Sequence, residues 1–317
     1  MTPIMEGKAW EPEQIVSTGS LLLDKCFKFG GIPTGSIIHY YSPPEHEGSH
    51  KTTMGMCGLA ELQKLGYKVG GIDTELTPWD QQWLEGKGLK ITKKQWVYSR
   101  PTSGEQAIND MEEMVEKYKC KGILFDSIEH ARPTSYRESE PGDANTGSHA
   151  KLMRQFWQRC KDLAESHNTT FFVINNSKAK LGFMPWEKGE TIAGGQGSTY
   201  APTVNIRLRR PSDSAIKDTT LIPIKVQVKR SKIGGSWSKF ELYFYEGLGV
   251  DRPSELLLLA SDVEIFKTST KKTDAKWDGK SIGVKKWSDC RQWAIENTDM
   301  ITKALKSIPK LEYLVGL

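Results

Sequence analysis

The chain has 317 residues, which suits one large α/β core with a small additional domain. Its hydrophobic content of 37% and charged content of 26% are ordinary for a globular protein, and it lacks the long apolar run of a membrane span. The first residues contain no apolar signal core, and the five cysteines form no CxxC pair, so we expect a cytoplasmic protein with reduced thiols and no structural zinc.

Short apolar runs alternate with longer helical stretches from residue 15 onward. Buried strands are predicted at residues 36–41, 67–72, 95–98, 122–125 and 169–174. Helices are predicted at residues 53–65, 103–118 and 148–167. This alternation indicates a mostly parallel sheet with helices on both faces. Three further strands, expected at residues 203–210, 221–228 and 240–245, would close the sheet with antiparallel edge strands.

The sequence pattern changes near Pro253, from predicted strands to helical and lysine-rich segments, and we place a domain boundary there. Helices are expected at residues 255–266 and again after residue 287. Residues 265–310 contain eleven Lys/Arg against five Asp/Glu, so this segment is more positive than the +5 of the whole chain. A basic appendage favours a polyanionic partner, although a solvated surface is an equal alternative on charge alone. The expected organisation is a short segment at 1–15, a core at 16–253 and a basic domain at 254–317.

The first strand runs into residues 42–53, which then lead into a helix. Strand, loop, Lys-Thr and helix is the arrangement of a P-loop, in which backbone amides cradle phosphates, the lysine reaches the β/γ oxygens and the hydroxyl holds Mg²⁺. The residues expected at a nucleotide are Gly48, Ser49, His50, Lys51, Thr52 and Thr53. The regular spacing fails, because Glu45 and His50 stand where glycines are usual. From this motif alone a surface loop is about as probable.

Polar side chains follow three of the predicted strands downstream of the loop. Glu75 stands where a water-activating carboxylate would lie, Asp126 ends an apolar strand in the manner of a Walker B aspartate, and Asn176 follows the strand at 169–174. Sites in open α/β sheets form at the carboxyl ends of strands. The three positions therefore support the phosphate-site hypothesis, whereas each alone is also compatible with a strand exit or a helix cap.

The chain resembles the RecA-type recombinases of bacteria and phages from about residue 15 to residue 306. The resemblance rests on four stretches of ordered motifs, at residues 16–24, 30–35, 103–106 and 277–283. It implies a RecA-like P-loop ATPase core with a mostly parallel sheet, followed by a small α+β C-terminal domain. The spacing from Lys51 to Glu75 matches that of the family.

The resemblance also assigns the nucleotide site. It implies ATP and Mg²⁺ as cofactors, with Glu75, Lys51 and Asn176 as catalytic residues and with Thr52 and Asp126 at the metal. Asp80 and Trp83 fall where the family contacts adenine. Lys232 and Arg230 resemble basic residues that reach the ATP of a neighbouring subunit, so a homo-oligomeric filament is expected.

Two segments, at residues 137–149 and 177–200, correspond to the DNA loops of the family. Lysines neutralise phosphates and an exposed aromatic side chain can stack on bases, which suits single-stranded DNA. A merely solvated loop has a similar composition. The expected DNA-binding residues are Lys178, Lys180, Met184, Trp186, Lys188, Gly194, Gly195 and Arg154. The C-terminal lysines at 271, 272, 280, 285 and 286 suit capture of duplex DNA.

Three functions compete on the sequence. The first is an ATP-dependent recombinase that coats single-stranded DNA and pairs it with a homologous duplex. The second is an ATPase-deficient relative that acts as a DNA-binding mediator or filament cap, which the irregular P-loop and the short segment before the core favour. The third is an unrelated P-loop enzyme such as a kinase, against which the second DNA loop and the basic C-terminal domain argue.

Overall fold

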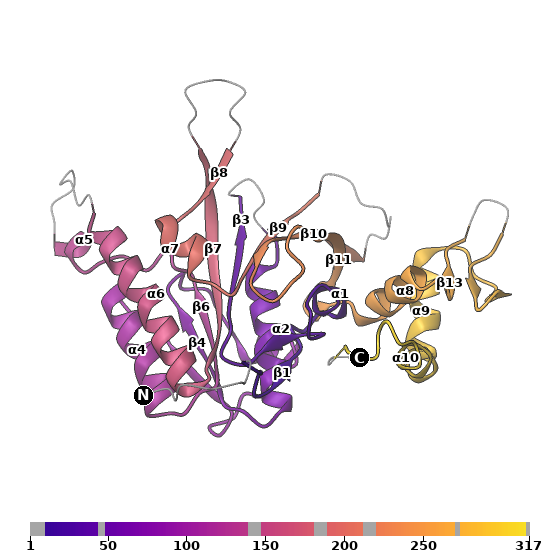
Figure 1. Ribbon diagram of the computed structural model, residues 1–317, viewed down its shortest axis with the longest axis horizontal. Coiled ribbons are helices and arrows are strands. Elements are labelled where there is room, and N and C mark those ends of the chain that lie inside the picture. The colour runs from indigo at the N-terminus through magenta and orange to yellow at the C-terminus, as the bar shows by residue number, and fades with distance from the viewer. Residues whose placement is uncertain are drawn as a thin grey trace.

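The computed structural model describes residues 10–43, 48–138, 147–180, 189–211, 220–269 and 273–314, without the side chains of residues 137–138, 178–180 and 189–191. Within these ranges a 10-stranded sheet has the order β12-β11-β10-β9-β3-β7-β6-β4-β5, and β8 pairs with β7 (Figure 1). Its strands are β3 (Ile37–Ser42), β4 (Val69–Asp73), β5 (Trp96–Ser99), β6 (Gly122–Asp126), β7 (Thr170–Lys180), β8 (Gly189–Ile192), β9 (Val204–Arg209), β10 (Leu221–Ser231), β11 (Lys239–Tyr245) and β12 (Gly249–Val250).

The central strands are parallel, and the chain closes the sheet with antiparallel strands. Strand β3 is parallel to both β7 and β9, and β4 is parallel to β5 and β6. Strands β10, β11 and β12 then follow β9 in antiparallel pairs. This arrangement confirms the predicted fold class, a mostly parallel sheet with antiparallel edge strands.

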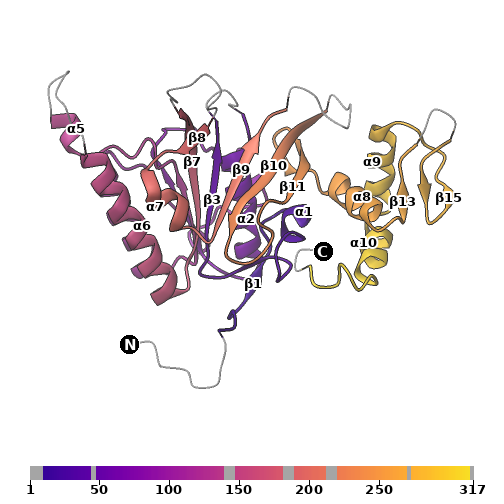
Figure 2. The same ribbon diagram turned by 45° about the horizontal axis from the view of Figure 1, so that its top comes forward.

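Helices cover both faces of the parallel part of the sheet. Helix α2 packs on β3, β6 and β7, whereas α4 and α6 pack together on the opposite face, as two views of the molecule show (Figures 1 and 2). The helices of the core are α1 (Leu21–Asp24), α2 (Lys51–Lys64), α3 (Gln81–Glu85), α4 (Gly104–Glu116), α5 (Ser135–Glu138), α6 (Ser148–His167) and α7 (Gly195–Tyr200). A two-stranded pair, β1 (Ile15–Val16) with β2 (Ile32–Pro33), encloses α1 in the chain.

Successive residues of each strand alternate between two apolar layers, as the pleat requires. Ile38 of β3 belongs to the layer with α2, whereas Ile37 belongs to the layer with α4 and α6. Helix α2 approaches the sheet closely at Gly58, where a Cβ atom would lie 2.4 Å from Cζ of Phe172. The tight contact fixes the helix whose N-terminus faces the phosphate loop.

Strand β7 is longer than predicted. The sequence suggested a strand ending at residue 174, but β7 continues to Lys180 because β8 returns antiparallel beside it, with Ser177 opposite Ile192. Asn175 and Asn176 therefore lie within a strand. The β7–β8 hairpin projects beyond the ends of the neighbouring strands (Figure 1).

The C-terminal part contains helices and a three-stranded antiparallel sheet. Its elements are α8 (Arg252–Asp262), β13 (Phe266–Lys267), β14 (Lys276–Trp277), β15 (Lys280–Ser281), α9 (Trp287–Glu296) and α10 (Thr298–Lys306). Helix α8 starts before the predicted residue 255, since the Asp251 side chain accepts from the backbone N–H of Ser254 and Pro253 lies in the first turn. The domain boundary near Pro253 thus falls at the start of a helix, and it stays a prediction.

Helix α8 joins the core through buried polar contacts. The Ser20 hydroxyl donates to Oε1 of Glu255 at 2.6 Å, and both residues are buried.

No helix in the described ranges is both long and apolar enough to cross a membrane.

Candidate nucleotide site and nucleic-acid interface

The start of α2 positions the side chains expected at a phosphate group. Lys51 is the first residue of the helix, and its Nζ lies 2.6 Å from Oγ of Ser42, the last residue of β3. The Ser49 hydroxyl is 3.5 Å from the same Nζ. Gly48 has a φ of 73°. The end of β3, the lysine and the helix N-terminus therefore face one place, which favours an anion. Glu45 lies outside the described residues.

His50 takes the place of the usual glycine by adopting the left-handed conformation, with a φ of 58°. Histidine enters this region more easily than branched residues do. Its ring stacks on Phe244 of β11 at a centroid distance of 4.5 Å. Burial, followed by the charges of Arg210 and Lys87, lowers the pKa of His50 to about 4. The ring is therefore neutral at pH 7 and anchors the loop through stacking.

Thr52 and Asp126 meet beside Lys51. The Thr52 hydroxyl donates to Oδ2 of Asp126 at 2.5 Å. Burial and, next, the charge of Glu75 raise the pKa of Asp126 to about 7, against the opposing effects of Thr52 and Lys51. The other carboxylate oxygen, Oδ1, is buried without a hydrogen-bond partner among the described residues. A hydroxyl and an unsatisfied buried carboxylate oxygen fit Mg²⁺, which takes few protein ligands when phosphates supply the others.

Glu75 follows β4 and lies close to the end of β6. The Ser127 hydroxyl donates to its Oε1 at 2.6 Å, and Nδ1 of His130 lies 3.0 Å from the same oxygen. Asp73 fixes the segment from the other side, because its Oδ1 accepts from the backbone N–H of Glu75 at 3.0 Å. The carboxylate is thus held at the sheet edge that also carries Thr52 and Asp126. The contribution of His130 had no signal in the sequence.

Asp80 and Trp83 lie at α3. Asp80 caps this helix by accepting from the backbone N–H of Trp83 at 2.8 Å. The ammonium of Lys87 lies 4.3 Å from the centroid of the Trp83 ring and donates to the carbonyl of Gly247 at 2.5 Å. These contacts connect α3 with the turn between β11 and β12, next to His50. An adenine contact at this point stays a prediction.

Asn176 contacts the turn after β6, and its role as a phosphate sensor stays a prediction. Its Nδ2 donates to Oε2 of Glu129 at 2.8 Å. The reason is the extension of β7, which places Asn176 inside the strand, level with the turn after β6. The amide therefore connects β7 with this turn.

The second DNA segment begins on the β7–β8 hairpin and ends on α7. Lys178 and Lys180 lie in β7, and Met184, Trp186 and Lys188 lie outside the described residues. Gly194 and Gly195 precede and begin α7 with φ values of 88° and 73°. A hollow of about 400 Å³ opens beside them, lined by Glu129, Arg132, Tyr136, His149, Ile192, Ala193, Gly194 and Gly195. The glycine backbone, an arginine and a histidine suit a phosphate backbone.

Arg154 is exposed in the second turn of α6, and its contact with DNA stays a prediction. Arg137 is part of α5, and residues 139–146 lie outside the described ranges. The first DNA segment therefore stays a prediction. Of the C-terminal lysines, those at 271 and 272 are likewise outside the described residues, whereas Lys280, Lys285 and Lys286 are exposed.

Lys232 and Arg230 lie at the opposite end of the sheet from Lys51. Arg230 is the next-to-last residue of β10, and Lys232 directly follows that strand. Strand β10 is antiparallel to β9, whereas β9 is parallel to β3, which leads to Lys51. Nζ of Lys232 donates to the carbonyl of Ala201 at 3.1 Å, and Arg230 reaches the carbonyl of Tyr200 at 3.4 Å. Burial, and next the charge of Arg230, lower the pKa of Lys232. One chain does not bring these cations to its own phosphate loop.

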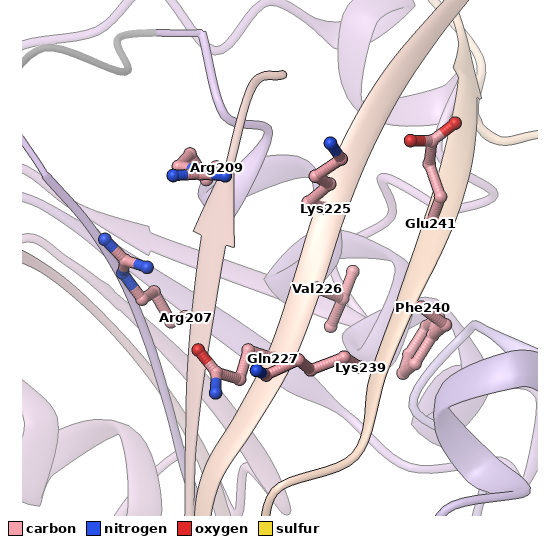
Figure 3. A pocket seen from close by; sticks show the side chains of 8 residues that line it. All are labelled: Arg207, Arg209, Lys225, Val226, Gln227, Lys239, Phe240 and Glu241. Atoms are coloured by element: carbon pink, nitrogen blue, oxygen red, sulfur yellow. The ribbon is translucent and has the colours of Figure 1, made fainter. Parts of the chain in front are cut away.

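A basic hollow on the antiparallel strands had not been expected from the sequence. Its volume is about 400 Å³, and it is lined by Arg207, Arg209, Lys225, Val226, Gln227, Lys239, Phe240 and Glu241 (Figure 3). Arg209 is directly opposite Lys225, which is opposite Glu241 on the other side. Like charges directly opposite one another weaken a sheet. Four cations with one carboxylate therefore indicate a polyanion-binding surface. The alternating arginines at 207 and 209 were the available signal.

Comparison with known proteins agrees with this arrangement. Residues 4–251 match the family described as RecA N-terminal domain. The chain is 33% identical over 256 residues to Protein RecA of Chloroherpeton thalassium, covering 80% of this chain and 69% of that protein. It is 30% identical over 258 residues to Protein RecA of Deinococcus radiodurans, with 80% and 69% covered. For Protein RecA of Laribacter hongkongensis the identity is 30% over 300 residues, with 93% and 81% covered.

Proposed function

The chain belongs to the RecA family, and from this premise we propose that it is an ATP-dependent recombinase that coats single-stranded DNA and pairs it with a homologous duplex. DNA recombination and repair, with binding of ATP and DNA, are the general functions of this family. The observation that carries the proposal is the convergence of Lys51, Thr52, Asp126 and Glu75 at one end of the sheet.

Each of these side chains has a distinct task in hydrolysis. Lys51, held beside Ser42 at 2.6 Å, supplies a fixed positive charge to the β/γ-phosphates. Thr52 and Asp126 would hold Mg²⁺, which neutralises phosphate charge when bound. Glu75, fixed by Ser127 and by the backbone contact with Asp73, is placed to orient a water and accept its proton.

Two separate surfaces suit the two DNA partners. The hollow beside Gly194 and Gly195 adjoins the β7–β8 hairpin and suits the single strand. The basic hollow with Arg209 and Lys225 is on other strands and suits the backbone of a further strand or duplex. The C-terminal lysines, including Lys285, add positive charge. Contacts of this kind go to phosphates and carry little sequence preference.

Assembly into a filament completes the nucleotide site in this proposal. Lys232 and Arg230 lie at the end of the sheet opposite to Lys51, so a neighbouring copy would present them to the bound ATP. Hydrolysis would then depend on contact between subunits.

The direct test is steady-state ATP hydrolysis with and without single-stranded DNA. We expect turnover with Mg²⁺ that DNA stimulates, and we expect Glu75→Gln to bind ATP but not to hydrolyse it. Glu85→Gln, at the exposed end of α3, is the matched control and should retain turnover. Nucleotide-dependent DNA binding without turnover would favour the ATPase-deficient mediator or filament cap. Failure to bind ATP at all would overturn the enzymatic role.

A further inference from the structure

The turn after β6 contacts the catalytic carboxylate on one side. Oε1 of Glu75 accepts from the Ser127 hydroxyl at 2.6 Å and lies 3.0 Å from Nδ1 of His130. The Ser127 backbone N–H also donates to Oγ1 of Thr74 at 2.9 Å, and Thr74 donates back to the carbonyl of Ser127 at 2.7 Å. The turn and the segment that carries Glu75 are therefore one bonded unit.

The same turn contacts the base of the DNA-facing hairpin on its other side. Glu129, which directly precedes His130, accepts from Nδ2 of Asn176 at 2.8 Å. The Ile128 backbone N–H donates to the carbonyl of Ile174 at 3.1 Å, and the Asn176 carbonyl accepts from Ala193 at 3.1 Å. Adjacent residues of a single turn therefore contact Glu75 in one direction and the β7–β8 hairpin in the other.

Glu129 is also the carboxylate in the wall of the hollow beside Gly194 and Gly195. Arg132 and His149 line the same hollow and attract phosphates. A phosphate that enters there meets the negative charge of Glu129 at short range, and like charges repel most strongly where water is scarce. Occupation of the hollow therefore disfavours the present position of Glu129 and its bond to Asn176.

We propose that Glu129 and His130 form a relay that restrains Glu75 until DNA fills this hollow. This inference rests on the proposed function and adds the means by which DNA stimulates hydrolysis. Without DNA, Ser127 holds Oε1 of Glu75 and the added contact from His130 locks the carboxylate in one orientation, so it cannot turn to follow the attacking water. When phosphates displace Glu129, the adjacent His130 moves with it and releases the carboxylate. Both are positioning residues, since they act through Glu75.

The first variant removes the contact between His130 and Glu75. In His130→Ala, turnover without DNA should rise, and the ratio of turnover with DNA to turnover without it should fall about fivefold or more. The His130 side chain is 44% exposed and belongs to neither apolar layer, so its loss should leave the core packing intact. His130→Asn keeps a short N–H donor and should restore part of the ratio. His167→Ala, near the far end of α6, is the matched control and should keep the wild-type ratio.

The second variant separates the relay from a structural role. Glu129→Gln keeps an oxygen that accepts from Asn176 but loses the charge that phosphates repel. A purely structural residue would tolerate this change, whereas the relay predicts that turnover with DNA falls toward the DNA-free turnover of the same variant. Glu116→Gln, on the exposed side of α4, is its control. DNA affinity, measured by fluorescence anisotropy, should not weaken in Glu129→Gln, since a repulsive charge has been removed.

The results distinguish a failure of the relay from a failure of the proposed function. If the wild type hydrolyses ATP and DNA stimulates it, but both variants keep the wild-type ratio, the relay is overturned and the recombinase proposal stands. A His130→Ala protein that loses turnover in both conditions also overturns the relay, because His130 would then support catalysis. If the wild type shows no turnover, the proposed function fails and the relay fails with it.

Discussion

Lys51 is held by its immediate neighbours at the point where β3 ends. Its Nζ contacts Ser42 at 2.6 Å and Ser49 at 3.5 Å, so the ammonium is oriented before a nucleotide arrives. Lys51→Ala should weaken ATP binding by at least about tenfold, because the phosphates lose a charge-assisted contact. Isothermal titration with a non-hydrolysable analogue and Mg²⁺ measures the change. Lys64→Ala, at the other end of the same helix and paired with Glu61, should leave the affinity unchanged.

His39 is a buried histidine whose protonation opposes folding. Burial lowers its pKa to about 4, whereas the unperturbed value is 6.5, and its Nδ1 contacts Oδ1 of Asn205 at 2.7 Å. The unfolded chain therefore binds a proton between these pH values and the folded chain does not. The stability contributed by His39 is present above pH 6.5 and is lost as the pH falls toward 4, by roughly 3 kcal/mol in total.

His39→Gln should remove this dependence. The free energy of unfolding of the variant, measured in urea, should fall less steeply between pH 6.5 and pH 4 than that of the wild type. Groups that titrate in both proteins, including His50, cancel in the comparison. Parallel curves for the two proteins over this range would contradict the assignment of a neutral His39.

The meeting of Glu75 and Asp126 at one end of the sheet could be predicted from the sequence, whereas their contacts with neighbouring side chains could not. Asp126 ends β6 and Glu75 lies two residues after β4, and the carboxyl ends of parallel strands meet, so chain position indicated where these carboxylates lie while their roles stay predictions. His130 lies three residues beyond Ser127 in a turn with no periodic pattern. Its approach to Glu75 depends on the path of that turn, which the residue order does not specify.

Among the elements, β7 differs most from its prediction, because it extends to Lys180 and pairs with β8. The two asparagines at 175 and 176 suggested a strand exit, because polar amides are unusual in a buried strand. The pairing of β8 with β7 supplies the partners instead, and Asn175 donates to the carbonyl of Ala193 at 2.8 Å. A pairing made across the intervening residues gives no local signal, so the strand length could not be predicted.

The cations that line the basic hollow on β9, β10 and β11 can be tested by substitution. Arg209→Gln should weaken DNA binding and reduce the slope of log affinity against log salt concentration by about 1, because one phosphate contact is lost. The free energy of unfolding should stay constant or rise by up to about 1 kcal/mol, since Arg209 is directly opposite Lys225. Lys117→Gln removes the same charge from α4 and should leave the slope unchanged. Equal slopes for all three proteins would exclude this hollow from the DNA surface.

For the whole molecule, the separation of Lys232 from Lys51 leads to a prediction about concentration. If a neighbouring copy supplies Lys232, turnover per molecule should rise with protein concentration and with DNA that aligns the subunits. Lys232→Ala should lower turnover while single-stranded DNA binding by the loop around Trp186 is largely retained. Lys93→Ala, which removes an exposed cation elsewhere, should behave as the wild type. Turnover per molecule that is independent of concentration would contradict a shared site.

DNA strand exchange measures the proposed function most directly. A fluorescent duplex is mixed with a homologous single strand, the protein, ATP and Mg²⁺, and the release of the labelled strand is followed over time. We expect exchange that requires ATP and homology and that Lys51→Ala abolishes. A wild-type protein that binds both ATP and single-stranded DNA but releases no labelled strand under these conditions would contradict a recombinase.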